Sequence, residues 1–555
     1  MDVALPLYGE HECPVHVGRG KRTDAVVLSG DELTIDGVLR VARFGAPVEV
    51  SRAALARVRA ARDVVDRVLE RGDLVYGLNT GLGPLARYRL APENLEQALV
   101  RTVVGHTAML GDELPTDTVR AMMLARANGI AKGGVGVRVE VMKALVDALN
   151  QGVHPVVSRG GSVGQADLSE MAQVAQVLIG LGQAEYHGQR RPGGEALAAA
   201  GLRPLRLQAK EALGLISANG VTVGQGSLVL ADLAELLYTF DIAAALALEG
   251  FGGNLTIIHP QADRLKPHPG QRLTADHLRA LLEGSYLWQA AGARNLQDPL
   301  SFRCIPQVHG SSADAYVSVR RTLEIELNAA SDNPLVALDD ASIISVGNFD
   351  VTNVALAFDM LRIALAKQVQ VANERIQKQL WAQFSGLPTG LGVLDEPVGG
   401  MHQLARLCAS LAAEAQLLAN HVSLVYHTQL AEGIEDHASM APLGVRKTEE
   451  LMRVAWRVAA LEMIVAARAI DLRGRPSLGR GTHVAYQAVR ARVPVDVVGW
   501  EPGVEDVVRV VADGQLAAWV TEELNGRDAV SWAPRGEPER RDGRLVADPA
   551  PPPGA

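Results

Sequence analysis

The residues whose types suit chemistry lie in short, glycine-rich polar stretches between long apolar segments. Tyrosine and glutamate can transfer protons, and arginine and asparagine can hold a polar ligand. Residues in turns between rigid elements carry function more often than residues in helical stripes. The stretches are "VYGLNTGLG" (75–83) with Tyr76, "QDPLSFRCIPQVHG" (297–310) with Arg303 and His309, "LNAASDNPLV" (327–336), "GNFD" (347–350) with Asn348, and "EGIEDHASM" (432–440) with Glu435.

Each of these stretches also has a purely structural interpretation. Tyr76 could bury its ring and bond a backbone carbonyl, and Arg303 could be a core arginine in a salt bridge. Asp332 and Asn333 are typical of a turn closed by an Asx hydrogen bond. The acidic cluster around Glu435 could be a solvated helix start, and a metal site is the less favoured alternative. "GLNTGLG" follows no strand of a βαβ unit, so it indicates nucleotide binding only weakly.

A sixth stretch is the loop within "PVVSRGGSVGQADLSEMAQ" (155–173). Its turn, Gly160-Gly161-Ser162-Val163-Gly164, runs directly into an aspartate and a helix-like segment. Turns of this composition let the backbone approach a ligand closely. No obvious nucleophile follows the turn, so the residues alone leave its chemistry open.

Helical periodicity dominates the elements that must position these residues. One apolar stripe runs from Leu404 to Val422 and another from Leu451 to Val465, and both are expected to lie in the core. Strand-like pieces occur near the start, in "AVVLSGDELTIDGV", without the alternation of strands and helices that a doubly wound sheet needs. We predict an all-α fold, a long-helix bundle with a smaller loop-rich N-terminal part. The expected long helices cover 92–110, 116–132, 139–150, 221–249, 313–330 and 352–380.

We expect four segments along the chain. They are an N-terminal extension (1–25), an N-terminal domain with the glycine-rich loop (26–208), a central and C-terminal helical bundle (209–530), and a disordered tail rich in proline and arginine (531–555).

Composition narrows the class of protein. The chain has 555 residues, 48% of them hydrophobic and 21% charged, as in a globular protein. A net charge of −9 without a basic stripe disfavours nucleic acid as a partner. The cysteines Cys13, Cys304 and Cys408 are too few and too scattered for a disulfide framework or a zinc site, and they fit a reducing cytoplasm. We expect no metal, no signal peptide and no membrane span.

Taken in order, the stretches resemble segments of the histidine/phenylalanine ammonia-lyase family of aromatic amino acid lyases. "YGLNTGLG", "VRAMMLARANGIAKGGVGVR", "LNQGVHPVV", "KPHPGQ", "QDPLSFRCIPQVHG", "LEIELNAASDNPLV", "GNF" and "EDHASM" match in sequence order from about residue 26 to about 475. The resemblance implies an all-α, aspartase-like fold with a long central bundle. It also implies a homotetramer whose active sites combine residues from three subunits.

The glycine-rich loop departs from that family. The family's loop reads Gly-Ser-Val-Gly-Ala-Ser-Gly-Asp-Leu, and its Ala-Ser-Gly triplet cyclises to the electrophilic methylidene-imidazolone group. This chain reads Gly161-Ser162-Val163-Gly164-Gln165-Ala166-Asp167, one residue shorter and without a Ser-Gly pair. Because the ring requires a dehydratable serine followed by glycine, we predict that the prosthetic group is absent and that no cofactor is used.

Other positions also differ from the family pattern. Ser217 replaces the asparagine that contacts the electrophile, Leu300 replaces a tyrosine, Asp350 replaces a histidine and Ile434 replaces a glutamine. Among the retained groups, the resemblance makes Tyr76 and Glu435 the proton-transfer residues. It makes Arg303 the carboxylate-binding residue, with Asn348, His106, Ser217 and Leu300 lining the substrate site.

Three hypotheses remain from the sequence. The first is a lyase-like enzyme of specialised metabolism that acts on an amino-acid-like or activated small-molecule carboxylate by acid–base elimination, addition, isomerisation or cyclisation. The second is a true ammonia-lyase or aminomutase with an unconventional electrophile. The third is a non-catalytic structural relative, which the retention of Tyr76, Arg303 and Glu435 disfavours. The mass of the intact chain would separate the second hypothesis from the others.

Overall fold

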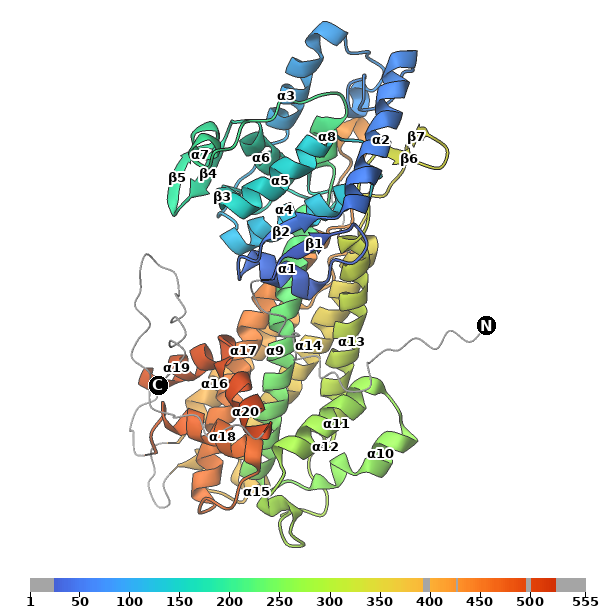
Figure 1. Ribbon diagram of the computed structural model, residues 1–555. Coiled ribbons are helices and arrows are strands. Elements are labelled where there is room, and N and C mark those ends of the chain that lie inside the picture. Colours follow the sequence, from blue (N-terminus) through green and yellow to red (C-terminus); the bar gives the residue numbers. More distant parts are fainter. Residues whose placement is uncertain (1–23, 393–399, 426–427, 496–500, 526–555) are drawn as a thin grey trace.

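The computed structural model describes residues 24–392, 400–425, 428–495 and 501–525 (Figure 1). Most of the expected N-terminal extension (1–25) and the whole expected tail (531–555) lie outside these residues. The strands are β1 (Val26–Leu28), β2 (Val48–Val50), β3 (Val153–Pro155), β4 (Gln183–Tyr186), β5 (Gln189–Pro192), β6 (Leu335–Ala337) and β7 (Ser342–Ile344). The remaining regular structure is helical, which confirms the predicted fold class.

The helices of the first half include four that match predicted segments, α3, α4, α5 and α9. The bounds are α1 (Ile35–Ala42), α2 (Arg52–Arg71), α3 (Leu95–Gly105), α4 (Thr116–Ala131), α5 (Val139–Gln151), α6 (Leu168–Leu178), α7 (Gly193–Ala199), α8 (Glu211–Ile216), α9 (Gly220–Phe251), α10 (Pro260–Leu265) and α11 (Pro269–Leu281).

In the second half, α13, α14, α16 and α17 lie where periodicity predicts helices. The bounds are α12 (Leu300–Arg303), α13 (Ile305–Leu327), α14 (Thr352–Leu380), α15 (Ala382–Ser385), α16 (His402–Leu418), α17 (Ala441–Leu472), α18 (Arg480–Arg490), α19 (Glu501–Ala512) and α20 (Gln515–Leu524).

Four long helices, α9, α13, α14 and α17, form the bundle that joins the two ends of the molecule (Figure 1). Nearly every residue of α9 is buried, so this helix is the centre of the core and is apolar on all sides. Close packing depends on small residues. A β-carbon on Gly224 of α9 would lie 2.7 Å from the Met122 nitrogen of α4, so glycine is needed for this approach.

The N-terminal part is helical with three small sheets at its periphery. Strands β1 and β2 pair in parallel, β3, β4 and β5 form an antiparallel sheet, and β6 and β7 form a hairpin. The predicted strand-like stretch "AVVLSGDELTIDGV" is strand only at Val26–Leu28. Its second half begins α1, because the Thr34 side chain accepts the Gly37 N–H and caps the helix.

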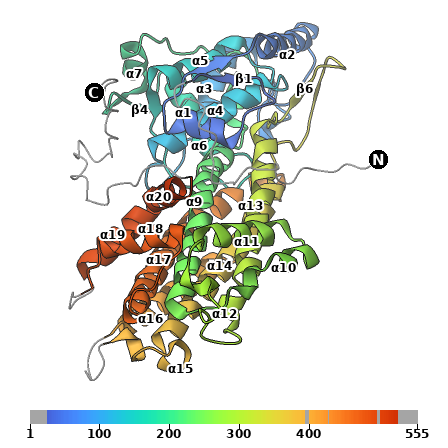
Figure 2. The same cartoon turned by 60° about the horizontal axis from the view of Figure 1, so that its bottom comes forward.

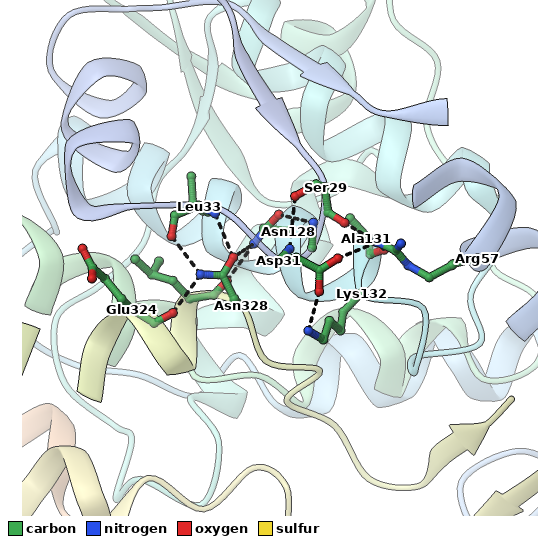
Figure 3. A network of polar contacts seen from close by, with 11 residues as sticks. Ser29, Asp31, Leu33, Arg57, Asn128, Ala131, Lys132, Glu324 and Asn328 are labelled. Atoms are coloured by element: carbon green, nitrogen blue, oxygen red, sulfur yellow. Dashed lines mark hydrogen bonds and ion pairs between the residues drawn. The ribbon is translucent and has the colours of Figure 1, made fainter. Parts of the chain in front are cut away.

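A polar network fastens the N-terminal segment to the end of the bundle (Figure 3). The Asn328 side chain, just beyond α13, accepts the Leu33 N–H and donates to the Leu33 carbonyl, both at 2.8 Å. Asn128 of α4 accepts the Gly30 N–H at 2.9 Å, and Lys132 pairs with Asp31 at 2.6 Å. These contacts fix the end of α13, and with it the turn that follows, against the N-terminal part.

None of the described helices is long and apolar enough to cross a membrane.

Candidate active site

Ser162 holds the glycine-rich loop in shape. Its hydroxyl donates to Asp167 Oδ1 at 2.9 Å and accepts the Gly164 N–H at 3.0 Å, and its own N–H donates to Glu170 Oε1 at 3.2 Å. The loop then places Ala166 at φ 63°, a left-handed conformation that is uncommon for a residue with a β-carbon. The exposed Gly161 is at the start of the loop, and the buried Asp167 ends it.

The tip of this loop is joined to two distant segments. Gln165 makes an antiparallel bridge to Asp350, and its side-chain amide donates to the His437 carbonyl. The His437 Nε2 lies 2.8 Å from Asp350 Oδ2 and 3.3 Å from Thr352 Oγ1. The fold therefore gathers three of the sequences singled out above, the loop, "GNFD" and "EGIEDHASM", at one place.

The junction between α8 and α9 forms the floor beside the loop. The predicted site residue Ser217 is buried there as the residue that caps the C-terminus of α8, where its N–H donates to the Leu213 carbonyl. Asn219, two residues later, donates to Ser331 Oγ at 3.0 Å and to the Phe349 carbonyl at 2.8 Å. Its Oδ1 is buried without a hydrogen-bond partner among the described residues, so an acceptor is free here.

The residue Asn219 was missed by the sequence analysis. The signal was Asn219 in "LISANGV", directly before the long apolar segment of α9, since asparagine is favoured at the N-cap of a helix. Its neighbour Ser217, which was predicted instead, lies at the end of the preceding helix.

The Tyr76 loop packs against this floor. The Tyr76 hydroxyl accepts the Gly83 N–H at 3.2 Å. A β-carbon on Gly77 (φ 66°) would lie 2.6 Å from Leu213 of α8, so the loop touches α8 closely. Residues 83–85 contact residues 431–433. A β-carbon on Gly83 would lie 3.7 Å from the β-carbon of Ala431.

In the sequence, Glu435 comes just after residues 431–433, which contact the Tyr76 loop. It forms a backbone bridge with Leu430 and is half-buried. The Tyr76 loop, the Glu435 segment and the Gln165 loop thus belong to one end of the molecule. The exposed Asn348 precedes Asp350 at the same place, and no hydrogen bond of its side chain occurs among the described residues.

Arg303 and Leu300 lie elsewhere. Both belong to α12, at the opposite end of the bundle from α3 and α8 (Figures 1 and 2). The Arg303 guanidinium makes no ion pair with the described residues, so the structural interpretation as a salt-bridged core arginine is not supported. Leu300 is 63% exposed. One copy of the chain does not bring these two residues to the Tyr76 end.

His106 caps the C-terminus of α3. Its Nδ1 lies 2.7 Å from the Thr102 carbonyl, one turn back in the same helix. Helix α3 contacts both α6 and α8, so His106 belongs to the end that carries the glycine-rich loop.

Carboxyl groups with shifted pKa values surround the loop. Burial, together with the nearby Asp350 charge, raises the pKa of Glu326 to about 7. The pKa of Asp350 lies below its usual value. Burial favours a higher pKa, but hydrogen bonds from Thr352 and His437 outweigh that effect. Beneath the loop, burial raises the pKa of Glu170 to about 7 and that of Asp167 to about 6.

The described residues contain no group of three or more His, Cys, Asp or Glu side chains that could hold a metal ion.

Asp332, predicted to shape a turn, accepts the Asn333 N–H and also forms a fully buried ion pair with Lys210 at 2.7 Å.

Comparison with known proteins shows the family. A family model for aromatic amino acid lyases matches residues 33–491. The histidine ammonia-lyase of Gloeobacter violaceus is 39% identical over 504 residues, 89% of this chain and 97% of that protein. The histidine ammonia-lyase of Alkaliphilus oremlandii is 38% identical and covers 84% of this chain and 92% of its own length.

Solved structures show the same fold. The ergothionase of Treponema denticola, an ergothioneine-degrading enzyme, has a TM-score of 0.86 at 29% identity, covering 89% of this chain and 99% of its own. The tyrosine aminomutase of Streptomyces globisporus has a TM-score of 0.84 at 29% identity, covering 91% and 99%.

These relatives overturn the prediction that the chain uses no cofactor. Histidine ammonia-lyases that are 36–39% identical over most of the chain belong to the class that carries the methylidene-imidazolone group, so the prediction is wrong and is withdrawn. The prediction relied on Gln165-Ala166 replacing the Ala-Ser-Gly precursor of the resembled family. In the structure, Gln165 uses its side chain to hold His437. The loop of this chain has no Ser-Gly pair.

The match of the family model over most of the chain and the identity to full-length histidine ammonia-lyases lead to the same conclusion. The chain is a lyase, and it belongs to the aromatic amino acid lyase family.

Proposed function

We propose that the protein is an ammonia-lyase-type enzyme that eliminates an amine from an amino acid, or adds one in reverse. Support comes from the gathering of the Tyr76 loop, the Gln165 loop and the Glu435 segment around the α8–α9 junction. Histidine ammonia-lyases, a tyrosine aminomutase and an ergothionase are among its relatives. Elimination of this kind needs a base for a proton next to the carboxylate-bearing carbon and a group that holds the carboxylate.

Tyr76 is the base in this proposal, and Glu435 is the partner that receives or returns a proton. Tyr76 lies in a glycine-rich loop that packs on α8, while Glu435 follows the segment that this loop touches. A positioned acid or base contributes about 10²–10⁴-fold to a rate. The buried, unpartnered Asn219 Oδ1 offers an acceptor at the floor of the same site, suited to the substrate amine.

Arg303 binds the substrate carboxylate, and it does so from a neighbouring copy of the chain. A guanidinium suits this task because its planar fork makes two parallel hydrogen bonds to a carboxylate. Its position on α12, far from α8, requires another copy to complete the site (Figure 1). The homotetramer implied by the family resemblance supplies such copies.

An apolar row on the bundle supports association of the chains. On α14, Leu356, Met360 and Ile363 are 51%, 45% and 57% exposed, at the spacing of one helix face. A row of this kind on a long helix is costly to leave in water and is suited to burial against another copy. We further propose a cytoplasmic location, which the free cysteines Cys304 and Cys408 support.

Co-expression of two inactive variants tests the proposal. Tyr76→Phe and Arg303→Ala are each expected to lose activity in assays of amine release from L-histidine, L-tyrosine and ergothioneine. Mixed tetramers recover activity if the two residues come from different copies, since some sites then contain both native groups. Tyr76→Phe combined with Arg303→Ala on one chain is the matched control, because mixing it with itself cannot restore a site. No recovery in the mixture, with both single variants folded and tetrameric, would contradict the shared site. Release of no amine by the parent enzyme from any of the three would contradict the proposed reaction for these substrates.

A further inference from the structure

Glu170 is a buried carboxyl directly beneath the glycine-rich loop. It lies in the first turn of α6 and is only 2% exposed. Its Oε1 accepts the Ser162 N–H at 3.2 Å, while its Oε2 is buried with no hydrogen-bond partner among the described residues. An ionised carboxylate oxygen in such a place would be costly, since no donor compensates for its lost hydration.

The neighbouring Asp167 is the carboxylate that is equipped to carry charge. It accepts the Thr222 N–H at 2.8 Å, the Thr222 hydroxyl at 3.1 Å and the Ser162 hydroxyl at 2.9 Å. Three side-chain and backbone donors of Ser162 and Thr222 stabilise Asp167 when it is ionised, whereas the Oε2 of Glu170 has no donor among the described residues. The proton of this pair therefore resides on Glu170, on the unpartnered Oε2.

Ser162 connects the Glu170–Asp167 pair to the tip of the loop through hydrogen bonds. Its N–H goes to Glu170 and its hydroxyl to Asp167, while the same hydroxyl receives the Gly164 N–H at 3.0 Å. Gln165, the next residue, is the one that bridges Asp350 and holds the His437 carbonyl. Three links thus join the buried carboxyl to the residues at the mouth of the proposed site.

We infer that Glu170 is a positioning residue, which in its protonated state holds Ser162 and, through Ser162, keeps Gln165 seated against Asp350 and His437. The inference rests on the proposed function only in treating this loop as part of the site. Loss of the proton places an unpaired charge beside Asp167, and opening of the loop to water relieves that charge.

The charged groups that act on Glu170 are Asp167 on its own turn and Arg446 of α17. Burial and the Asp167 charge raise the pKa of Glu170 to about 7, although Arg446 opposes them. Because the pKa is raised, the loop is held below about pH 7 and loosens above it.

Hydrogen exchange of the loop amides, measured by mass spectrometry without substrate on the full chain, tests the inference. Protection of residues 161–167, corrected for intrinsic exchange, is expected to fall about tenfold or more between about pH 6 and about pH 8.5, since one pKa unit of mismatch corresponds to a tenfold change. Glu170→Gln keeps an acceptor for the Ser162 N–H but cannot ionise. It should remain protected at both pH values.

Two further variants complete the test. Glu170→Leu removes the acceptor and should leave the loop poorly protected at both pH values, while Glu195→Gln, at an exposed glutamate of α7, should behave like the parent protein. Persistence of the pH dependence in Glu170→Gln would overturn the inference, and so would full protection in Glu170→Leu. If Glu170→Leu does not fold, Glu170→Gln alone decides. Since no substrate is involved, failure of the proposed lyase reaction would leave this result intact.

Discussion

The Asp350 carboxylate and the His437 imidazole lie 2.8 Å apart although 87 positions separate them in the sequence. Gln165, from a third segment, bridges the backbone of Asp350 and binds the carbonyl of His437. The pair therefore joins the segments 347–350 and 432–440, both of which contact the glycine-rich loop through Gln165.

We expect Asp350 and His437 to be energetically coupled, but weakly. His437 is 65% exposed and Asp350 is 35% exposed in their side chains, so solvent screens the pair. A double-mutant cycle with Asp350→Asn and His437→Gln should give a coupling free energy of about 0.2–1 kcal/mol at neutral pH, from chemical denaturation. Because the pKa of Asp350 is depressed, its stabilising contribution is present at pH values above the usual pKa of an aspartate. It disappears as the pH falls through the lowered pKa. A coupling of zero at neutral pH would show that the contact has no effect on stability.

Conservative changes should separate catalysis from folding at Tyr76 and Arg303. Tyr76→Phe removes the hydroxyl and should reduce turnover about 10²–10⁴-fold, with a cost of about 1 kcal/mol in unfolding free energy for the lost bond from Gly83. Arg303→Lys should mainly raise KM, since lysine cannot reproduce the planar fork. Tyr88→Phe is the control, at an exposed tyrosine just beyond the same loop. Reduced melting temperature in both variants with parental turnover would assign the residues a structural role instead.

The stability of the bundle should fall as the pH rises from about 4.5 to about 7. Glu249 of α9 is fully buried, and burial raises its pKa from 4.5 to about 7, although Ser285, Thr482 and the Gly479 N–H oppose this shift. The folded state therefore keeps a proton that the unfolded chain loses between these two pH values, and the unfolding free energy decreases across that window. Glu249→Gln cannot ionise, so denaturation midpoints measured at several pH values should show a shallower decrease. Identical slopes for parent and variant would contradict the assignment to Glu249.

The ion pair between Arg375 of α14 and Glu462 of α17 should be costly to break from one side. Both side chains are fully buried, and Arg375 Nη2 lies 3.0 Å from Glu462 Oε2. Glu462→Leu leaves a buried guanidinium unpaired and should reduce the unfolding free energy by about 3–5 kcal/mol. Replacing both partners, Arg375→Met with Glu462→Leu, should recover most of that loss in chemical denaturation. Equal destabilisation by the single and the double variants would argue against the pairing.

The long helices could be predicted because their periodicity is continuous, as in α9 and α14, whose apolar residues extend over many turns. The small strands were harder to predict, since the Thr34 cap converts half of a strand-like stretch into α1. Periodicity describes local geometry and contains no information about such caps unless they are examined individually.

The candidate site was predictable only in part. The sequence singles out Tyr76 and Glu435, and their roles stay predictions, but the pairing of Gln165 with Asp350 and His437 depends on contacts between distant segments. Glu170 was missed because a glutamate in the first turn of a helix is ordinarily a solvated, dipole-stabilising residue. Only the fold shows that it is buried beneath the loop.

The two hydrogen bonds between the Leu33 backbone and the Asn328 side chain can form only late in synthesis of the chain. These residues are 295 positions apart, so the N-terminal segment leaves the ribosome long before its partner does. At about 5–20 residues per second, that interval is roughly 15–60 s. During this time the first strands and helices have no bundle to bind, and their apolar faces are open to chaperones or to other nascent chains. Synthesis of the chain is therefore the period in which it is most exposed to aggregation.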